Sequence, residues 1–202
     1  MSDESEIKVI LLGETGVGKT NLIRVATGED FNPNSSSNVT NTYSEGDTVI
    51  NNKKYKYFLW DTAGQEKYRS MNKLFINGSK IILIVFAINS RKSFEEIDFW
   101  YKYVTDALGP GNYIIALVAN KSDLYEEDDT LKEDEISQKA NELGVKFKTT
   151  SARTDAPGFI DFLNEMLAEY IKKYLSEGDE DPNAFKINQK KNKDTKEGKK
   201  CC

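Results

Sequence analysis

The stretch GETGVGKT, residues 13–20, decides the fold of this protein. It matches the pattern G-x-x-x-x-G-K-[ST] and lies between an apolar run at residues 7–12 and a predicted helix at residues 19–27. Glycines let backbone N–H groups curl around phosphate oxygens, and the N-terminus of the following helix favours negative charge. Lys19 would reach the outer phosphates of a nucleotide, and the Thr20 hydroxyl would ligate Mg²⁺. The motif alone does not separate a GTPase from an ATPase, a nucleotide kinase or a sulfotransferase.

Apolar runs and helical patterns alternate on both sides of this loop. Strands are predicted at residues 7–12, 43–50, 54–61, 81–87, 113–120 and 146–150, and helices at residues 19–27, 94–108, 131–143 and 159–175. The pair Asn51-Asn52 between two strands predicts a hairpin turn. This order predicts an α/β fold, a doubly wound and mostly parallel sheet with one antiparallel edge strand and helices on both faces. Ligands of such sheets bind at the carboxyl ends of the strands.

Length, charge and cysteine positions limit the function. The 202 residues fit one nucleotide-binding domain at residues 7–176, with a disordered N-terminus at residues 1–6 and a disordered basic tail at residues 177–202. The net charge is −5, but residues 186–202 carry +5, so the rest carries −10, which argues against general nucleic-acid binding. With no histidine, imidazole catalysis and most zinc sites are excluded. The two cysteines are the last two residues, which indicates a cytosolic location without a disulfide framework.

The sequence Asn-Lys-Ser-Asp at residues 120–123 follows a predicted strand and indicates the base. Guanine presents a ring N–H and an amino group side by side, and the Asp123 carboxylate would accept hydrogen bonds from both. Adenine offers no matching pair of donors, so this pairing would discriminate between the two bases. Asn120 could bond N7, and Lys121 could lay its stem along the ring. The triplet Thr-Ser-Ala that ends at Ala152 follows the next strand, where the Ala152 N–H would meet the guanine O6.

The sequence Trp-Asp-Thr-Ala-Gly-Gln-Glu at residues 60–66 completes the set. Asp61 would hold a water of the Mg²⁺ shell, and Gly64 would permit close backbone approach to the γ-phosphate. Gln65 would orient the attacking water and is the predicted catalytic residue. Each short motif is weak in isolation, but their order along one chain predicts a protein that binds and hydrolyses GTP.

These motifs resemble the nucleotide-binding elements of Ras-like GTPases, and the spelling of residues 60–66 and the terminal Cys201-Cys202 resemble the Rab branch most. The resemblance covers roughly residues 7–175. It implies a GTP hydrolase with a slow intrinsic rate that depends on an activating protein. The GTP-binding residues that it implies are Glu14, Thr15, Gly16, Val17, Gly18, Lys19, Thr20, Asn21, Phe31, Gly64, Asn120, Lys121, Asp123, Ser151, Ala152 and Arg153.

The resemblance also implies roles for four aromatic side chains. Phe31 would pack edge-on against the guanine. Tyr43, Trp60 and Phe75 fall where Rabs carry an aromatic triad that effectors contact, and ordinary core packing is the alternative for each. Thr15 replaces a glycine of Ras itself, but Rabs often carry a side chain there, so hydrolysis is expected to be slow rather than abolished.

Residues 38–43, Asn-Val-Thr-Asn-Thr-Tyr, depart from the usual Rab sequence T-I-G-V-D-F. The gap-free spacing to Asp61 places Asn38 at the threonine that contacts Mg²⁺ and the γ-phosphate. The predicted metal ligands are therefore Thr20, Asp61 and Asn38. Thr40 is the alternative to Asn38, because a slip of two residues keeps a side chain on the same face of an extended segment. Rabs typically carry a tyrosine pair together with an arginine where this chain has Leu-Phe-Ile-Asn at residues 74–77. The resemblance is therefore to a divergent Rab.

The partners follow from the same resemblance. A Rab-like switch in vesicle-mediated traffic would need an exchange factor, a GTPase-activating protein, a prenyl-binding chaperone of the GDI type, and effectors on the switch face. Lipids on Cys201 and Cys202, beside a basic tail, would hold a monomer at the cytoplasmic face of an intracellular membrane, with a cytosolic pool.

Two alternative functions stay open at this point. A guanine-nucleotide-binding scaffold of the same fold that does not cycle is one, and Asn38 is the argument for it. A small-molecule phosphotransferase is the other, but it would need a lid with grouped arginines, which the sequence lacks.

Overall fold

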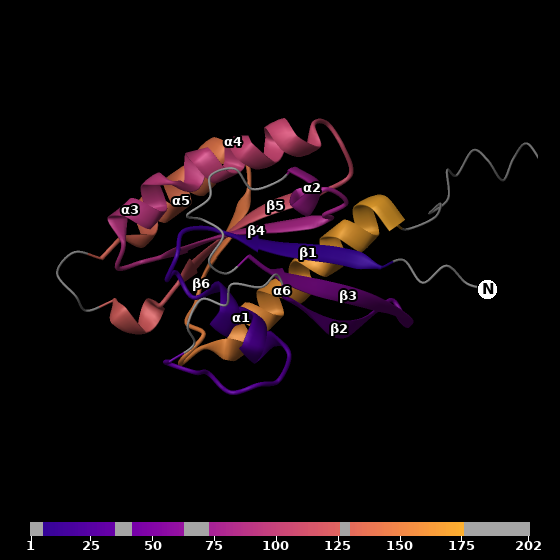
Figure 1. The fold of residues 1–202 in the computed structure, drawn as a ribbon, viewed down its shortest axis with the longest axis horizontal. Coiled ribbons are helices and arrows are strands. Elements are labelled where there is room, and N and C mark those ends of the chain that lie inside the picture. The colour runs from indigo at the N-terminus through magenta and orange to yellow at the C-terminus, as the bar shows by residue number, and fades with distance from the viewer. Residues whose placement is uncertain (1–5, 35–41, 63–72, 126–129, 176–202) are drawn as a thin grey trace, which may run out of the picture.

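The apolar runs form one six-stranded sheet with the strand order β2-β3-β1-β4-β5-β6 (Figure 1). The computed structural model describes residues 6–34, 42–62, 73–125 and 130–175. The strands are β1 (Ile7–Leu12), β2 (Thr42–Ile50), β3 (Lys53–Asp61), β4 (Ile81–Ala87), β5 (Ile114–Asn120) and β6 (Lys146–Thr149). The helices are α1 (Lys19–Ala26), α2 (Lys73–Ile76), α3 (Arg91–Glu95), α4 (Ile97–Leu108), α5 (Glu133–Leu143) and α6 (Ala156–Tyr170), with a 3₁₀ turn at Ser122–Leu124 and a π-helical turn at Ile171–Leu175.

The sheet is parallel except at one edge. β1 pairs in parallel with β3 and β4, β4 with β5, and β5 with β6, whereas β2 pairs antiparallel with β3. The hairpin turn between β2 and β3 places Asn51 at φ 53° and Asn52 at φ 61°. Two successive positive φ angles are what a two-residue hairpin turn requires, and asparagine tolerates them. The predicted fold class and hairpin are therefore confirmed.

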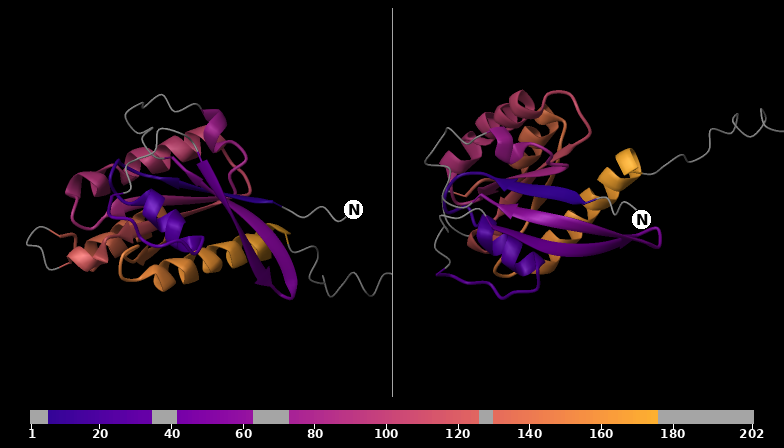
Figure 2. Two further views of the ribbon diagram at one scale, coloured as in Figure 1. Left: turned by 60° about the horizontal axis from the view of Figure 1, so that its bottom comes forward. Right: turned by 45° about the vertical axis from the view of Figure 1, so that its right-hand side comes forward.

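Helices cover both faces of the sheet because its strands are apolar on both sides (Figure 1 and Figure 2). In β1, Val9 and Leu11 join a core cluster with α1 and α6, whereas Ile10 and Leu12 join a second cluster with α4 and α5. The last helix buries one apolar face in the core. Its buried members are Phe159, Phe162, Leu163, Met166, Leu167, Tyr170 and Ile171.

The predicted helix at residues 94–108 is wrong in its first part. Helical structure already begins at Arg91, and Glu96 separates α3 from α4. Ser90 caps α3 by accepting a hydrogen bond from the Ser93 N–H, and the Ser93 hydroxyl donates to the carbonyl of Ser90. These local side-chain bonds favour an early start of the helix, whereas the prediction followed only the apolar pattern.

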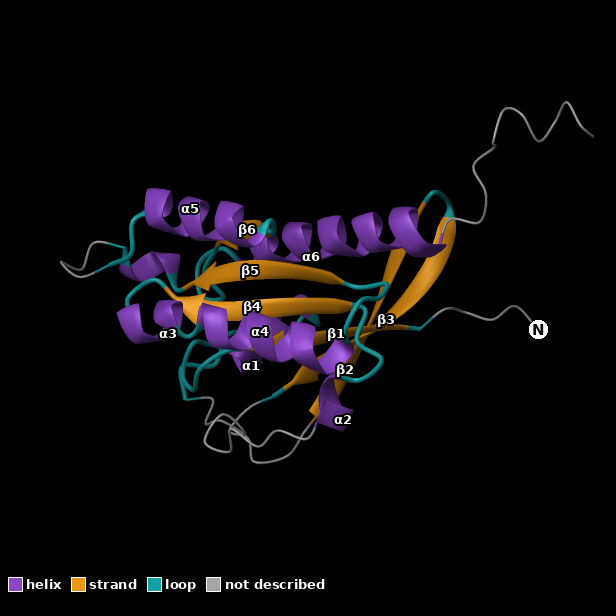
Figure 3. Ribbon diagram, turned by 90° about the horizontal axis from the view of Figure 1, so that it is seen from above, coloured by secondary structure: helices purple, strands orange, loops and turns teal. Residues whose placement is uncertain are grey.

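The carboxyl ends of the parallel strands meet at one edge of the sheet, seen from another side in Figure 3. The loops that follow β1, β5 and β6 therefore lie close together, beside the end of β3, and these loops contain three of the predicted motifs. Within the described ranges, none of the helices has the length and apolar character needed to cross a membrane.

Candidate nucleotide-binding site

The phosphate loop after β1 is pressed against its neighbours. Gly13 has φ 142°, and a Cβ atom there would lie 1.9 Å from the carbonyl oxygen of Val85 in β4. Gly18 has φ 99°, and a Cβ atom there would lie 2.3 Å from Nδ2 of Asn120. Only glycine fits both positions without displacing β4 or the Asn120 side chain at the end of β5. Glycine at positions 13 and 18 thus lets the loop pack closely against the sheet.

Lys19 lies inside this loop with only 4% of its surface exposed. Its Nζ donates hydrogen bonds to the carbonyls of Gly13, at 2.7 Å, and Glu14, at 2.9 Å. The ammonium is therefore held at the start of α1, where the N-terminus of the helix also favours an anion. The first turn of α1 contains no acidic side chain to compete for that position. This arrangement fits the phosphates of a nucleotide.

Thr20 and Asp61 come together from α1 and the end of β3. The Thr20 hydroxyl donates to Oδ2 of Asp61 at 2.7 Å, and Asp61 is buried. The next residue, Thr62, donates its hydroxyl to the carbonyl of Leu11 at 2.8 Å, which holds the end of β3 beside β1. A hydroxyl and a carboxylate are hard oxygen ligands that suit Mg²⁺, which commonly keeps several waters and substrate phosphates in its shell.

The residues present therefore fit a magnesium ion bound with its substrate. In the ranges that the structure describes, no group of three or more acidic or cysteine side chains could hold a metal ion by itself. A magnesium site at Thr20 and Asp61 would therefore need phosphate oxygens of the nucleotide to complete its shell.

Asn120 connects three of the predicted motifs. Its side chain is 1% exposed, and its Nδ2 donates to the carbonyl of Val17 in the phosphate loop at 2.8 Å. Its Oδ1 accepts from the N–H of Ala152 at 3.1 Å. The phosphate loop, the loop after β5 and the loop after β6 are thus joined by one amide. The sequence predicted contacts of Asn120 and Ala152 with the base, and the structure adds that they bond to each other.

Asp123 is positioned by the loop after β6. The Ser151 hydroxyl donates to Oδ1 of Asp123 at 2.5 Å, and the same oxygen of Ser151 accepts from the N–H groups of Arg153 and Thr154. Arg153 itself extends into solvent, with its guanidinium 3.9 Å from Oδ2 of Asp123. Lys121 has a positive φ of 67°, which marks the sharp turn after β5. The carboxylate that is predicted to read guanine therefore has a fixed orientation.

The segment that contains Phe31 is attached to α1 by a reciprocal pair of bonds. Asn21 donates from Nδ2 to the carbonyl of Asn32 at 3.0 Å, and its Oδ1 accepts from the Asn32 N–H at 3.0 Å. Phe31 is half-buried and packs against the core cluster of α1 and α6. The structure thus brings this segment beside the phosphate-loop helix, and the contact of Phe31 with a base stays a prediction.

The three predicted surface aromatics lie in a row. The ring centroids of Tyr43 and Trp60 are 5.2 Å apart, and those of Trp60 and Phe75 are 5.6 Å apart with nearly perpendicular planes. Tyr43 is 53% exposed, so it is not a core residue. Phe58 adds a fourth ring, 5.6 Å from that of Tyr43. The sequence did not predict Phe58, although its alternation with Trp60 along β3 places both on one face of the sheet.

Several predicted site residues cannot be compared with the structure. Asn38, Thr40, Gly64, Gln65 and the pair Cys201-Cys202 lie outside the described residues. Their roles in metal binding, hydrolysis and lipid attachment stay predictions.

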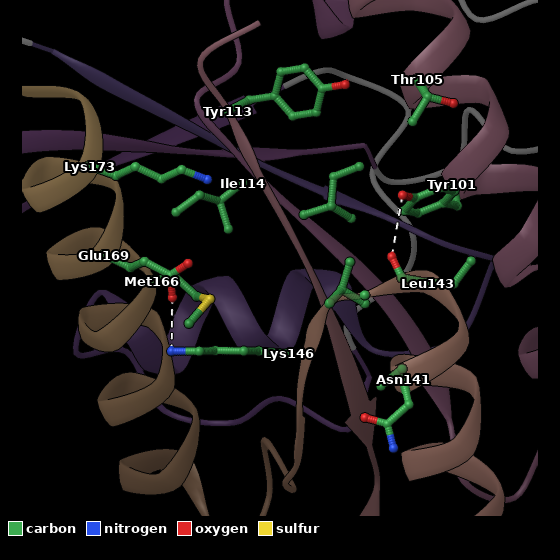
Figure 4. Close-up of a pocket in the computed structure, with 14 residues that line it drawn as sticks. Tyr101, Thr105, Tyr113, Ile114, Asn141, Leu143, Lys146, Met166, Glu169 and Lys173 are labelled. Carbon is green, nitrogen blue, oxygen red and sulfur yellow. Dashed lines mark hydrogen bonds and ion pairs between the residues drawn. The ribbon is translucent and has the colours of Figure 1, made fainter. Parts of the chain in front are cut away.

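A separate cavity of about 500 Å³ lies near the amino end of β5, away from the motifs (Figure 4). Its lining includes Tyr101 of α4, Ile114 of β5 and Met166 of α6, and Lys146 forms an ion pair with Glu169 at one side. No sequence pattern indicated this cavity. None of the site residues that the sequence predicts is among its lining residues, so it does not belong to the nucleotide site.

The sequence of this chain is similar to those of known GTP-binding and Ras-related proteins. A model of the Ras family matches residues 8–172. GTP-binding protein ypt3 of Schizosaccharomyces pombe is 34% identical over 165 residues, which cover 82% of this chain and 76% of that protein. Ras-related protein RABA1b of Arabidopsis thaliana is 34% identical over 180 residues, covering 88% and 82% respectively. Ras-related protein Rab-22A of Homo sapiens is 27% identical over 197 residues, 98% of either chain.

Proposed function

Because the chain belongs to the Ras family, and within it to the Rab GTPases, we propose that it cycles between GDP- and GTP-bound states to regulate vesicle-mediated membrane traffic. It is a small GTPase, and its class of reaction is GTP hydrolysis. The observation that carries the proposal is that the phosphate loop, the loops after β5 and β6 and the Thr20–Asp61 pair meet at one edge of the sheet. The alternative of a scaffold that does not cycle is not favoured by the relatives.

The chain's own groups would bind the nucleotide at its two ends. Lys19 and the N-terminus of α1 would contact the phosphates, where positive charge and helix dipole act together. At the other end, Asp123 would accept from the two adjacent donors of guanine, held in orientation by Ser151. Asn120 would keep these two ends at a fixed separation, because it bonds to both loops.

A magnesium ion would be held by Thr20 and Asp61, with Asn38 or Thr40 as the further ligand. When bound, the ion would neutralise charge on the phosphate oxygens during hydrolysis. The Thr20–Asp61 distance of 2.7 Å supports this assignment, because it shows that the two side chains reach the same point beside the phosphate loop.

Hydrolysis would depend on Gln65, which would orient the attacking water. A single-turnover assay on the GTP-loaded protein tests the cycle. The wild type should release phosphate slowly, and Gln65→Leu should slow that release further while GTP affinity stays nearly unchanged. A wild type that releases no phosphate, even with an activating protein of the Rab type, would favour the scaffold alternative.

The identity of the switch ligand can be tested in the same assay. Asn38→Thr, Asn38→Ala and Thr40→Ala are compared for Mg²⁺-dependent GTP release and for hydrolysis. Loss of activity in Thr40→Ala alone would assign the role to Thr40. If none of the three variants changed either rate, the loop would not close on the nucleotide.

Membrane attachment and partners complete the proposal. Lipids on Cys201 and Cys202, together with the lysine-rich tail, would bind the protein to an anionic membrane surface. GTP would order the segments around Asn38 and Gln65, and effectors would then bind the aromatic row of Tyr43, Trp60 and Phe75. An exchange factor, an activating protein and a GDI-type chaperone would regulate the cycle.

A further inference from the structure

Lys8 occupies an unusual position, in the strand at the centre of the sheet. It is the second residue of β1, and its register partner in β3 is Phe58. Its strand neighbours on the same face, Ile10 and Leu12, are fully buried in the second core cluster. Burial lowers the pKa of the Lys8 amine from its ordinary value. A charged side chain in such surroundings needs partners that compensate for the lost water.

The partners of Lys8 are carbonyl oxygens and aromatic rings. Its Nζ donates to the carbonyl of Phe75 at 2.5 Å and to that of Asn77 at 3.1 Å. The same nitrogen lies 4.7 Å from the ring centroid of Trp60 and 5.4 Å from that of Phe75. Among the described residues, no carboxylate forms an ion pair with it. The ammonium therefore depends on the end of α2 and on two ring faces.

The helix α2 depends on Lys8 in return. Its described part is Lys73–Ile76, which ends next to the two carbonyls that Lys8 bonds. Ile76 anchors it in the core, and the two carbonyls at its end are bonded by Lys8. Cations at the carboxyl end of a helix bond its last carbonyls and interact favourably with its dipole. Lys8 thus links β1 to the segment that carries Phe75.

We propose that Lys8 is a positioning residue of the aromatic surface formed by Tyr43, Phe58, Trp60 and Phe75. One ammonium bonds the main chain at Phe75 and lies against the rings of both Phe75 and Trp60, so it fixes how these rings meet. The Phe75 ring stays at right angles to Trp60, and the surface keeps one shape. Its relevance to effectors rests on the proposed function, whereas the positioning itself can be tested without any effector.

The test uses Trp60 as its own reporter. The chain has two tryptophans, so Trp100→Phe leaves Trp60 as the only one. In this background, with GDP bound, we compare the wild-type lysine with Lys8→Met and Lys8→Arg by acrylamide quenching of fluorescence. Methionine keeps an apolar stem but lacks the charge and the donors, whereas arginine keeps both. Lys56→Met is the matched control, because Lys56 is an exposed lysine of the same strand as Trp60.

Lys8→Met should raise the quenching constant of Trp60 at least about twofold, because the end of α2 would open locally and uncover the ring. Lys8→Arg should restore the wild-type value, and Lys56→Met should not change it. GDP affinity should be the same in all four proteins. Equal quenching in Lys8→Met and wild type would overturn the proposal, and so would an equal rise in Lys56→Met.

Two further measurements keep the outcomes separate. If Lys8→Met does not fold, Lys8→Gln replaces it, since its amide keeps N–H donors but lacks the charge. A rise in the quenching constant of Trp60 is again expected, and quenching equal to that of wild type would again overturn the proposal. Single-turnover GTP hydrolysis is measured on the same proteins. A wild type that does not hydrolyse GTP would count against the proposed cycle and leave the quenching result intact, whereas unchanged quenching with normal hydrolysis would refute only the role of Lys8.

Discussion

Replacement of Asn120 by alanine should weaken nucleotide binding through the protein's own loops, not only through a lost contact with the base. In the wild type, the Asn120 amide bonds to Val17 at 2.8 Å and to Ala152 at 3.1 Å. Alanine lacks this amide, so the buried carbonyl of Val17 and the buried N–H of Ala152 would lose their hydrogen-bond partner. The phosphate loop and the loop after β6 would then lose the side chain that bonds both of them.

The size of the effect follows from these two bonds. A buried polar group that loses its partner costs about 1–3 kcal/mol, so two such groups cost about 2–6 kcal/mol. Both groups lie beside the site and can gain some hydration, so we take the lower end, about 2 kcal/mol. That corresponds to roughly a 30-fold loss of GDP affinity. Asn120→Asp should also weaken binding, because a carboxylate oxygen would then face the Val17 carbonyl.

The assay must distinguish the loss of the Asn120 bonds to Val17 and Ala152 from the loss of a bond between Asn120 and guanine N7. GDP and its 7-deaza analogue, which lacks that nitrogen, are titrated against wild type and Asn120→Ala. If the bonds within the protein dominate, the affinity of the alanine variant falls by a similar factor for both nucleotides. Asn141→Ala, at an exposed position of α5, is the control and should bind like wild type. An alanine variant within about threefold of wild type for GDP, under ~1 kcal/mol, would refute the reasoning.

Three further predictions address the base, the edge strand and the tail. Asp123→Asn should lose GDP affinity and gain xanthine-nucleotide affinity, because one acceptor becomes a donor; competition binding checks this. Gly46→Ala should lower the thermal midpoint by about 3–10 °C at unchanged GDP affinity, because overpacking costs about 1–3 kcal/mol. Its Cβ would lie 2.3 Å from the Tyr57 ring, whereas Gly111→Ala, whose nearest contact is 3.6 Å, should be neutral. Serine at both terminal cysteines should remove the protein from the membrane fraction with its thermal midpoint unchanged, and unaltered fractionation would contradict lipid attachment.

Features that depend on neighbours in the sequence were predicted well. The phosphate loop has a fixed pattern of glycines, and the hairpin turn needs two residues that accept positive φ angles. The last helix shows its buried face directly in its apolar spacing. Local patterns of this kind gave the fold class and the strand positions, and they predicted the site residues that the structure gathers at one edge of the sheet.

Features that depend on distant residues were not predicted. The bond from Asn120 to Val17 spans 103 residues, and the bond from Lys8 to Phe75 spans 67. In the sequence, Lys8 is one polar residue in an apolar strand, and nothing around it specifies which carbonyls it meets. The bonds of Asn120 and Lys8 therefore follow from the assembled sheet rather than from any local propensity. The early start of α3 is a local feature, and it was missed because the capping bonds at Ser90 outweighed the apolar pattern.

The end of β3 places the predicted magnesium ligand next to the aromatic surface. Adjacent residues of a strand point to opposite faces, so Asp61 turns toward Thr20 while Trp60 turns toward Tyr43 and Phe75. One peptide unit therefore separates the predicted magnesium ligand from the centre of the aromatic surface. We expect a main-chain displacement of Asp61 on a change of nucleotide to be transmitted to Trp60, because the two residues share a peptide unit in a strand that is paired on both sides. Lys8, which contacts Trp60 from β1, would limit how far that ring can follow.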